Sequence, residues 1–449
     1  MNTPVNDLPK PSYQDVLATD ERRAPEVLYD RTEEFLGSED ISIDRYLSAE
    51  WHELEVERVW KKVWQMVCRV EDLREVGDHV LYEIADQSLI IVRDTPDTIR
   101  AFHNACLHRG TTLRESAGQV PSFRCPFHGF TWSLGGELVH VPASWDFPHL
   151  DPAEYCLPEA RVGVWGGFVF VNLDPDGEAF ESYLEVLDHH FAAFSIENRY
   201  KAYHVSQVID ANWKTVMEAF LEGYHVGTTH PQTLNFAGDF NIQYDVYGRH
   251  VSRLLQAIGV PSPVVAGEVS ENDIADAAQS ATRPEHRFTV PEGGRARPLL
   301  ADRFRAGLTR MHRTDLSMVS DAEILDSIQY FLFPNFHPWA GHGTPLAYRF
   351  RPYRNDPDRA IMEVMLLYPI PDDGNYEVCE MLELEPGASW TTAPGFENIG
   401  VIFDQDMDNL PRVQKGLHAT RKPGVTLANY QEIRIRHFHH TLDDYLAIE

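Results

Sequence analysis

Cysteine is scarce in this chain, and the few present are far apart in the sequence. There are five in 449 residues. A small secreted domain held together by disulfides needs a denser and more regular set, so the sequence excludes a disulfide framework. We therefore expect a reducing cytoplasm as its home. The five are Cys68, Cys106, Cys125, Cys156 and Cys379.

Long apolar runs are also missing. No stretch approaches the roughly 20 apolar residues that a helix needs to span a bilayer. The first residues, MNTPVNDLPKPSYQDV, lack a charged segment followed by an apolar core. We therefore expect neither an export signal nor a membrane anchor.

Positive charge is in deficit. Lysine and arginine together number 39 against 69 acidic residues, which gives a formal net charge of −30. A surface this acidic repels phosphate backbones and anionic lipid, so nucleic-acid binding is excluded as the main function. No G-x-G-x-x-G fingerprint follows a predicted strand, so the sequence shows no dinucleotide-binding motif.

The amount of apolar sequence suffices for two or three domains, since 43% of the residues are hydrophobic. Residues 1–47 are polar and punctuated by proline, which predicts an arm that packs on the second domain. Residues 48–165 are expected to form a small antiparallel β domain, and residues 166–449 a second, α+β domain. The alternative at this boundary is one continuous β structure.

The first domain is predicted to begin with a helix over residues 48–67, because valines and a tryptophan recur there at near-helical spacing. Short β-type runs follow Gly77, and Gly163–Asp174 is predicted to be a buried strand at the boundary. These runs are HVLYEI, SLIIVRD and IRAFHN.

The second domain is predicted to contain a helix over residues 212–225, strands, and two C-terminal helices over residues 394–417 and 428–446. Between about 248 and 316 the sequence shows few periodic features, which favours loops with one or two short helices or, alternatively, disorder. The expected strands are SIQYFLFPN, LAYRFRPY and AIMEVMLLYPI.

Two short motifs in the first domain carry potential metal ligands. Cys106 and His108 form C-x-H, and after sixteen intervening residues Cys125 and His128 form C-x-x-H. Such a set can hold zinc, or an iron-sulfur cluster in which two histidines replace two cysteines on one iron. A zinc finger places its two cysteines together in the sequence and its two histidines together, whereas here each loop offers one cysteine and one histidine. The spacing therefore favours the [2Fe-2S] cluster, with Gly110 and Gly129 allowing tight turns and Pro126, Phe127 and Trp132 shielding it.

The second domain offers a further pair of histidines. On the predicted helix, Glu218, Glu222 and His225 share a face, and His230 follows five residues after His225. On an unbroken helix five steps rotate a side chain by roughly 140°, so the helix must end near His225 if both rings bind one ion. The alternative is an ordinary amphipathic helix with incidental histidines.

These motifs in this order resemble the large, catalytic subunit of Rieske non-haem iron oxygenases, the ring-hydroxylating dioxygenase and monooxygenase family. The resemblance rests on CLHRG, CPFHGFTW, GFVFVNLDP and NWK…EGYHVGTTHP, which extend over much of the chain. It implies that Cys106, His108, Cys125 and His128 hold the [2Fe-2S] cluster. It also implies that the second domain has a helix-grip-like α+β fold with an antiparallel sheet.

An oxygen-activating iron usually has two histidines and one carboxylate on one face, so His225 and His230 need an acid. The segment VIFDQDMDN offers Asp404, Asp406 and Asp408, of which only Asp406 falls on the apolar stripe of a helix. The family pattern, an aspartate followed eight residues later by Gln414, agrees. Asp404 is the main rival, a salt-bridged structural aspartate is the alternative, and Pro411 departs from the family pattern and makes the helical register less certain.

Glu222 lies outside this set of three ligands. By resemblance, a carboxylate at this position bridges a cluster histidine of one subunit to the first iron histidine of its neighbour, which also predicts an oligomer. Many relatives have aspartate at this position. The alternative is a carboxylate at the rim of the core.

The resemblance implies a terminal oxygenase that uses O2 to monohydroxylate, dihydroxylate or oxidatively demethylate a small, hydrophobic or aromatic substrate, as in aromatic hydrocarbon catabolism. Electrons are expected to come from NAD(P)H through a partner flavin reductase, directly or through a ferredoxin. They enter the Rieske cluster and pass to mononuclear Fe(II) in a homotrimer or a trimer with small β subunits. Arg109, Arg114 and Arg124 are candidates for docking an acidic ferredoxin, or are simply solvated arginines.

Aromatic and apolar residues of the second domain are candidates for a substrate pocket, although core packing explains them equally well: Phe220, Leu221, Phe236, Phe240 and the run Phe331–Phe336. Two other classes of protein are also compatible with the sequence. An electron-transfer Rieske protein needs the cluster but no second iron site, and a zinc-stabilised binding protein needs neither.

Overall fold

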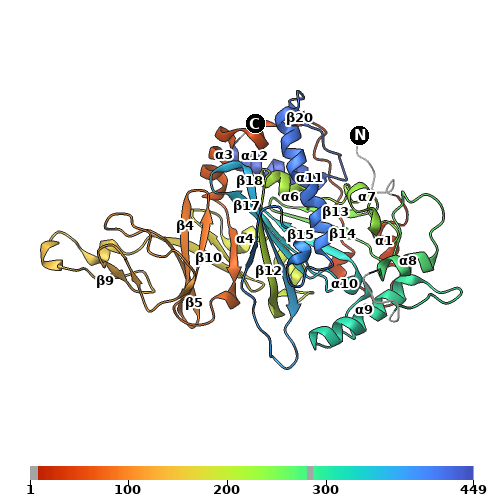
Figure 1. The fold of residues 1–449 in the computed structure, drawn as a ribbon, viewed down its shortest axis with the longest axis horizontal. Coiled ribbons are helices and arrows are strands. Elements are labelled where there is room, and N and C mark those ends of the chain that lie inside the picture. The colour runs from red at the N-terminus through yellow and green to blue at the C-terminus, as the bar shows by residue number, and fades with distance from the viewer. Residues whose placement is uncertain (1–8, 281–286, 448–449) are drawn as a thin grey trace. The chain divides into compact units, whose positions relative to one another are not determined.

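A computed structural model describes residues 9–280 and 287–447 of the chain (Figure 1). By its internal contacts the chain divides into two compact units. The small unit comprises Glu53–Tyr183 and Tyr353–Asn355, and the large unit comprises Met1–His52, Leu184–Pro352 and Asp356–Glu449. The predicted boundaries at residues 47 and 165 stay predictions.

The small unit consists mainly of antiparallel β-structure. Its seven-stranded sheet has the order β2-β11-β10-β5-β4-β3-β6, and a three-stranded sheet has the order β7-β8-β9. The strands are β2 (Gln65–Arg69), β3 (Asp78–Ile84), β4 (Gln87–Thr95), β5 (Thr98–His103), β6 (Gly118–Gln119), β7 (Phe123–Arg124), β8 (Thr131–Trp132), β9 (Leu138–His140), β10 (Glu159–Trp165) and β11 (Phe168–Asn172). The three predicted strand runs after Gly77 correspond to β3, β4 and β5.

The helix predicted over residues 48–67 is too long. Helix α3 (Ala49–Glu55) and a π-helical turn, η3 (Val56–Trp60), end before Gln65, and residues 65–69 form strand β2 instead. Strand β2 pairs with β11, so its backbone groups are satisfied by the sheet and all five of its residues are buried. The β-branched valines that suggested helical spacing are equally suited to a buried strand.

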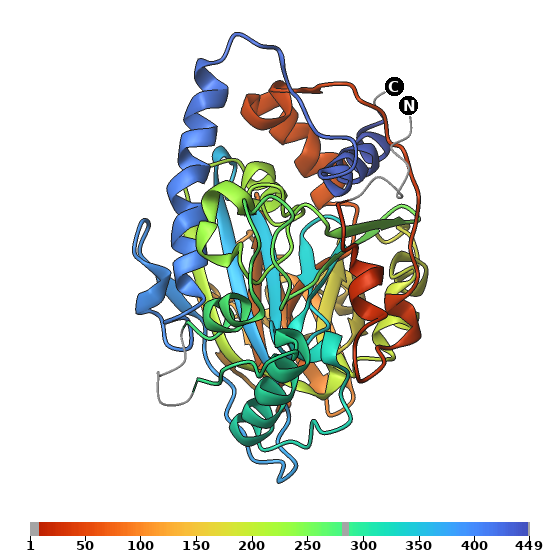
Figure 2. The ribbon, with the colours of Figure 1, turned by 90° about the vertical axis from the view of Figure 1, so that its right-hand side faces the viewer.

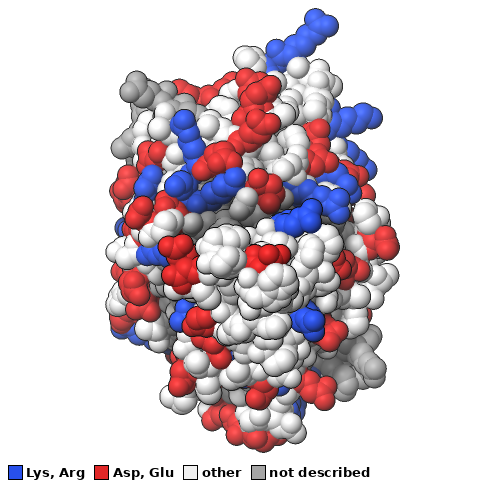
Figure 3. Space-filling model, turned by 90° about the vertical axis from the view of Figure 1, so that its left-hand side faces the viewer, with Lys and Arg blue, Asp and Glu red and all other residues white. Residues whose placement is uncertain are grey.

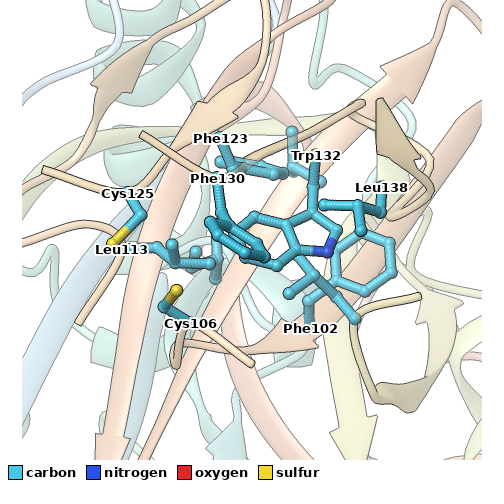
Figure 4. Close-up of a cluster of buried hydrophobic side chains, with 11 residues drawn as sticks. Phe102, Cys106, Leu113, Phe123, Cys125, Phe130, Trp132 and Leu138 are labelled. Atoms are coloured by element: carbon cyan, nitrogen blue, oxygen red, sulfur yellow. The ribbon is translucent and has the colours of Figure 1, made fainter. Parts of the chain in front are cut away.

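Apolar side chains from several strands of the small unit form its core (Figure 4). Phe123, Phe130 and Trp132 pack together, and the sulfur atoms of Cys106 and Cys125 lie at one end of the cluster, on two different segments. Both cysteines are almost completely buried. The core thereby holds the two thiols in an apolar environment. Short helices complete this unit: η4 (Val70–Asp72), η5 (Ser144–Asp146), η6 (Pro152–Tyr155) and α4 (Phe180–Tyr183).

The large unit is built on an eight-stranded sheet with the order β13-β14-β15-β16-β17-β18-β12-β19. Its described pairings are antiparallel except for β12 with β19. The strands are β12 (Arg199–Ile209), β13 (Gln243–Tyr247), β14 (Val251–Gln256), β15 (Ser327–Leu332), β16 (Phe336–Pro338), β17 (Leu346–Tyr353), β18 (Asp356–Pro369) and β19 (Leu382–Leu384), and a separate pair joins β1 (Ile41–Ser42) to β20 (Gly424–Val425).

Helices surround this sheet (Figure 2). Helix α11 (Gly400–Ala419) is the longest described helix of the unit and packs on α6 (Trp213–Glu218) and β12. It continues through Pro411. The remaining helices are α1 (Tyr13–Leu17), η2 (Glu26–Leu28), α2 (Asp44–Leu47), α5 (Leu187–Phe191), η7 (Ile196–Asn198), α7 (Val226–Thr229), η8 (Pro231–Thr233), α8 (Glu271–Ala278), α9 (Ala296–His312), α10 (Asp321–Leu325), η10 (Trp390–Thr392) and α12 (Ile433–Leu446).

The region from 248 to 316 is more ordered than the sequence indicated. It contains strand β14, helix α8 and the 17-residue helix α9, whereas the prediction allowed one or two short helices and no strand. Strand β14 is buried along most of its length between β13 and β15. A buried strand with neighbours on both sides shows no clear polar alternation, which explains why its pattern was not recognised. Residues 281–286 of this region lie outside the described residues.

The N-terminal segment is tied to the large unit by buried polar contacts. The Arg297 guanidinium on α9 donates to Asp20 at 2.7 Å and to Asp326 at 2.6 Å, and these side chains are almost completely buried. The hydroxyl of Tyr13 also donates to Asp326, at 3.2 Å. Moving this segment away would leave a buried charge without its partner, which costs several kcal/mol of stability. These contacts therefore hold the segment in place.

Glu432, immediately before α12, should make stability depend on pH. Burial raises the pKa of Glu432 from 4.5 to about 7, although a hydrogen bond from the Ala428 amide opposes that shift. The folded chain therefore binds this proton more tightly than the unfolded chain, and stability falls as pH rises from about 4.5 to about 7. We expect Glu432→Gln to stabilise the protein by roughly 3 kcal/mol above about pH 8 and to have little effect below about pH 4. Melting temperatures of both proteins across this range test it, and a pH-independent difference would contradict it.

The architecture confirms the predicted α+β class with antiparallel sheets. Among the described residues, every helix is too short or too polar to cross a membrane.

Candidate metal centres

Two similar loops in the small unit carry the predicted cluster residues. In the first, the Cys106 amide donates to Thr111 and the Gly110 amide donates to Cys106. In the second, the Cys125 amide donates to Phe130 and the Gly129 amide donates to Cys125. Gly110 and Gly129 have φ angles of 78° and 79°, a left-handed conformation that glycine adopts without strain. The tight turns that the sequence predicted are therefore present.

The loops bring like residues together. Their two cysteines lie in the core, and the imidazole rings of His108 and His128 lie 4.7 Å apart between centroids. His108 also stacks on Phe130, at 4.6 Å and an interplanar angle of 5°. The arrangement offers a pair of thiols on the buried side and a pair of imidazoles nearer to solvent.

This donor set fits a Rieske cluster. The Nδ1 atom of His108 is buried and has no hydrogen-bond partner among the described residues, which is costly for an imidazole unless it binds something. A Rieske centre takes two cysteines on one iron and two histidines on the other, and this matches the pairing of the side chains.

The shielding of this site differs from the expectation in two residues, since Pro126 is exposed as well as Phe127. Trp132 is fully buried, as predicted, but 59% of Phe127 is exposed, and its ring lies against His128 at 3.8 Å. Instead, Phe130 and Phe147 cover His108. Phe147 comes from a loop distant in sequence from both motifs, so no local pattern could identify it.

Acidic and basic side chains both occur on the face drawn in Figure 3, with uncharged residues over much of its centre. Of the three arginines considered for docking, Arg109 and Arg124 are exposed. Arg114 is half-buried, and its guanidinium donates to Nε2 of His79 at 3.0 Å.

The second candidate centre lies in the large unit, where the chain leaves α6. The helix predicted over residues 212–225 ends at Glu218. Asn212 caps its start by accepting a hydrogen bond from the Lys214 amide at 3.0 Å. The Gly223 amide donates to the Tyr244 hydroxyl at 2.9 Å instead of continuing the helix. A Cβ atom at Gly223 would lie 2.3 Å from the terminal methyl group of Ile242, so a larger residue here would displace that side chain.

The early end of α6 orients the two histidines. His225 lies at the start of the short helix α7, and His230 lies directly after its end. Their ring centroids are 5.2 Å apart at an angle of 74°. Glu218 and His225, predicted to share a helical face, therefore lie on separate elements.

Asp406 on α11 completes this centre. Its Oδ1 atom lies 3.0 Å from Nε2 of His230 and 3.6 Å from Nε2 of His225. One ligand atom of each residue lies within 4.8 Å of the other two. Donors bonded to one ion at about 2 Å and roughly right angles are about 3 Å apart, so these distances fit a two-histidine, one-carboxylate iron site.

The other two aspartates of this helix are engaged elsewhere. Asp404 accepts hydrogen bonds from the Ser389 hydroxyl and from the Trp390 amide, the latter at 2.7 Å. Asp408 is exposed and lies 3.7 Å from Arg412. The side of α11 that is buried at Asp406 stays buried beyond Pro411. There the side-chain oxygen of Gln414 accepts a hydrogen bond from the Asn212 amide at 3.0 Å.

Each histidine of this centre has a partner for its second ring nitrogen. Nδ1 of His225 lies 2.6 Å from Glu222, and Nδ1 of His230 lies 2.8 Å from Oε1 of Gln405. Because each acceptor receives a hydrogen bond from Nδ1–H, the proton stays on Nδ1 and Nε2 is left free to bind a metal. Gln405 was missed in the sequence, since a glutamine beside an aspartate on a helix carries no distinguishing signal.

The charge around His225 favours a basic imidazole. Burial lowers the pKa of His225, but the hydrogen bond to Glu222 and the carboxylates of Glu222 and Asp406 outweigh this effect and raise the pKa above its usual value. A basic imidazole is a good electron donor to a metal ion.

Removing the Gln405 contact should weaken metal binding. In Gln405→Ala, His230 keeps its place but loses the acceptor that orients its ring, so we expect iron affinity to fall about tenfold. Titration of the metal-depleted protein with Fe(II) in the absence of oxygen measures this. Asn409→Ala, one turn further along the same helix, is the control and should bind iron like the wild type. Equal affinities for Gln405→Ala and the wild type would contradict the role of Gln405.

A cavity of about 360 Å³ lies next to this centre. Its lining includes His225, His230 and Asp406 together with mostly apolar side chains. Phe220 and Phe236 line it, as the sequence suggested, whereas Leu221, Phe240 and the run Phe331–Phe336 are outside the lining. Further apolar lining residues are Ile258, Phe304, Ile324, Leu325, Trp339, Leu346, Tyr348, Ile399, Ile402 and Phe403.

Comparison with known proteins agrees with both centres. A family model described as the ring hydroxylating alpha subunit (catalytic domain) matches residues 189–448, and one for the Rieske [2Fe-2S] domain matches residues 63–151. Among solved structures, a quaternary ammonium Rieske monooxygenase in complex with L-carnitine has a TM-score of 0.62 at 17% identity, covering 90% of this chain and 95% of that one. Naphthalene 1,2-dioxygenase with bound indole has a TM-score of 0.63 at 19% identity, covering 92% and 93%.

Curated relatives match over a shorter length. The glycine betaine monooxygenase oxygenase subunit of Chromohalobacter salexigens is 33% identical over 195 residues, which cover 43% of this chain and 42% of that one. The anthranilate 1,2-dioxygenase large subunit of Acinetobacter baylyi is 33% identical over 206 residues, covering 42% of each chain. The matches thus span less than half the length of these relatives. Since the catalytic-domain model alone matches more than half of this chain, the chain belongs to the family of ring-hydroxylating oxygenase alpha subunits and carries a Rieske domain ahead of the catalytic domain.

Proposed function

We propose that this chain is a terminal oxygenase that adds one or two atoms of O2 to a small organic substrate. The observation that carries the proposal is the convergence of His225, His230 and Asp406 at the wall of an apolar cavity. A Rieske protein that only transfers electrons has no use for such a site beside a cavity. The oxygenase is therefore preferred to the electron-transfer alternative.

The roles follow from the two donor sets. Cys106, His108, Cys125 and His128 would hold the [2Fe-2S] cluster, and His225, His230 and Asp406 would hold Fe(II). When bound, the cluster supplies electrons singly, and the iron supplies open coordination positions for O2. The Glu222 carboxylate orients the His225 ring by accepting a hydrogen bond from its Nδ1 atom.

The cavity determines what reaches the iron site. Its mostly apolar wall excludes water and favours a hydrophobic or aromatic body, which gains free energy by leaving water. The relatives are named for varied compounds, including glycine betaine, anthranilate and, in Cupriavidus, chlorobenzene. Of these three, chlorobenzene is the uncharged one and suits an apolar wall best.

Partner proteins are part of the proposal. A flavin reductase that oxidises NAD(P)H, alone or with a ferredoxin, would reduce the cluster, and the exposed Arg109 and Arg124 would meet an acidic partner. A trimer, with or without small β subunits, would allow Glu222 of one subunit to contact a cluster histidine of the next. In the single chain Glu222 accepts from the Nδ1 and backbone amide of His225.

Oxygen labelling tests the activity directly. The purified protein, a surrogate reductase and NADH would be supplied with ¹⁸O2 and a panel of monocyclic and bicyclic aromatic compounds. We expect a product that is heavier by one or two labelled atoms, and the mass distinguishes monooxygenation from dioxygenation. A protein with both metal centres loaded that consumes no O2 and forms no labelled product with any member of the panel would overturn the proposal.

A further inference from the structure

One wall of the cavity carries polar side chains in a row. Strands β14 and β15 pair so that Gln256 lies opposite Ser327 and Leu254 lies opposite Gln329. Residues directly opposite each other in an antiparallel pair project from the same face of the sheet, as do residues two apart along a strand. All four line the cavity. Gln256, Ser327 and Gln329 therefore form a polar strip in a lining that is otherwise mostly apolar.

The amide of Gln329 is fixed in orientation. The Arg434 guanidinium on α12 donates through Nη1 to Oε1 of Gln329 at 2.7 Å, and through Nε to the Ser252 hydroxyl at 3.0 Å. An arginine can only donate, so the oxygen of Gln329 must face Arg434 and the NH2 group must point away from it. No described residue accepts a hydrogen bond from that NH2 group. Gln329 thus offers the cavity a donor held in place from behind.

A positive charge lies behind this donor. Arg434 is fully buried, and no carboxylate of the described residues lies within ion-pair distance of it. Burial lowers the pKa of Arg434 to about 9, which leaves the guanidinium charged at neutral pH. Asp245 acts on Arg434 only from beyond ion-pair distance, so this buried cation favours electron-rich atoms nearby, because little water is present to screen it.

The lining has no direct partner for a fully charged substrate. It contains no lysine or arginine within the described part of the chain, and its carboxylates, Glu222 and Asp406, are engaged with the two histidines. A substrate carboxylate would lose its hydration and meet only a neutral amide. A substrate ammonium would meet no free carboxylate and would be repelled by Arg434.

We infer that the cavity selects an uncharged, largely apolar substrate that carries one hydrogen-bond acceptor oxygen, such as a ketone, ether or phenol oxygen, and that the NH2 group of Gln329 binds this oxygen. This inference rests on the proposed function, since it takes the cavity to be the substrate site. Gln329 is then a residue that determines specificity by contacting the substrate away from the iron ligands.

Equilibrium binding tests this without turnover. The oxidised holoenzyme would be titrated by calorimetry with matched pairs that differ by one carbonyl group: acetophenone and ethylbenzene, and 1-tetralone and tetralin. We define the preference as the Kd of the hydrocarbon divided by the Kd of the ketone. Gln329→Glu retains an oxygen for Arg434 but removes the donor, so we expect the preference of the wild type to fall at least about tenfold in this variant.

Ser252→Ala is the matched control. It removes another hydrogen bond of Arg434, but Ser252 lies outside the cavity lining, so the preference should match that of the wild type. If Ser252→Ala lowers the preference as much as Gln329→Glu does, Gln329 acts by bracing Arg434 and the inference is overturned. It is also overturned if the wild type binds neither ketone, binds each ketone and its hydrocarbon alike, or binds benzoate more tightly than acetophenone.

The outcome is separable from that of the proposed function. If the ketone preference depends on Gln329 but no labelled oxygen enters any compound, the oxygenase proposal fails and the inference about ligand chemistry is supported. If labelled products form while Gln329→Glu leaves the preference unchanged, the oxygenase proposal is supported and the inference fails.

Discussion

Asp406→Ala should remove the mononuclear iron and reduce substrate oxidation to background, a loss of at least about a hundredfold, while the absorption spectrum of the Rieske cluster stays unchanged. Asp406 supplies the one carboxylate oxygen that lies close to Nε2 of both His225 and His230. Without it two neutral imidazoles remain, which hold Fe(II) weakly because the carboxylate charge that offsets the ion is lost. Iron analysis, the visible spectrum and turnover with a surrogate reductase measure the three effects.

Asp408→Ala is the control for this variant, because Asp408 is exposed on the same helix and lies near Arg412 instead of the two histidines. It should keep the iron and the activity of the wild type. Oxygenase activity retained by Asp406→Ala would contradict the assignment of the third ligand. If Asp404→Ala instead lost the iron while Asp406→Ala kept it, the rival aspartate would be the ligand.

Glu222→Gln should keep both metals but slow single-turnover oxidation about 10- to 100-fold. The amide oxygen of glutamine can still accept a hydrogen bond from Nδ1 of His225, so the ring stays in place. The negative charge that makes His225 basic is lost, and in the proposed trimer the charged partner for a cluster histidine of a neighbouring subunit would be lost as well. Rapid mixing of the chemically reduced protein with O2 and substrate, followed by the absorbance of the cluster, measures the rate of electron transfer.

Glu218→Gln is the matched control for Glu222. Glu218 also pairs with a histidine, since its Oε1 lies 2.8 Å from Nε2 of His439, but it does not line the cavity or contact the iron site. We expect this variant to change stability and to leave the single-turnover rate close to that of the wild type. A Glu222→Gln protein with an unchanged rate would show that Glu222 is not part of the electron path.

The sequence was most informative where chemistry restricts the residue type. Cysteine and histidine at fixed short spacing, and glycine at the tight turns, indicated both loops of the small unit, and Gly110 and Gly129 adopt the expected backbone conformation. Asp406 could be distinguished from its neighbours because helical periodicity alone determines which side of α11 is buried. The comparisons show the family that these motifs suggested.

The sequence was least informative where tertiary contacts override local preference. Residues 65–69 pair with β11, so this segment leaves the helix that its spacing predicted. After α6 the Gly223 amide donates to the Tyr244 hydroxyl and the His225 amide to the Glu222 carboxylate, so the second predicted helix also ends early. The contacts of Gln405 with His230 and of Phe147 with His108 join residues distant in sequence, and no local pattern signals them. The polar strip that includes Gln329 became visible only through the register of β14 with β15.

We expect one chain to hold both a Rieske cluster and a separate mononuclear iron. Iron content per chain, determined together with the electron paramagnetic resonance spectrum of the dithionite-reduced protein, tests it most directly. We expect about three irons per chain, two of which belong to the cluster and produce its reduced-state signal. A fully reconstituted protein with only about two irons per chain, or with zinc in place of the cluster, would contradict it.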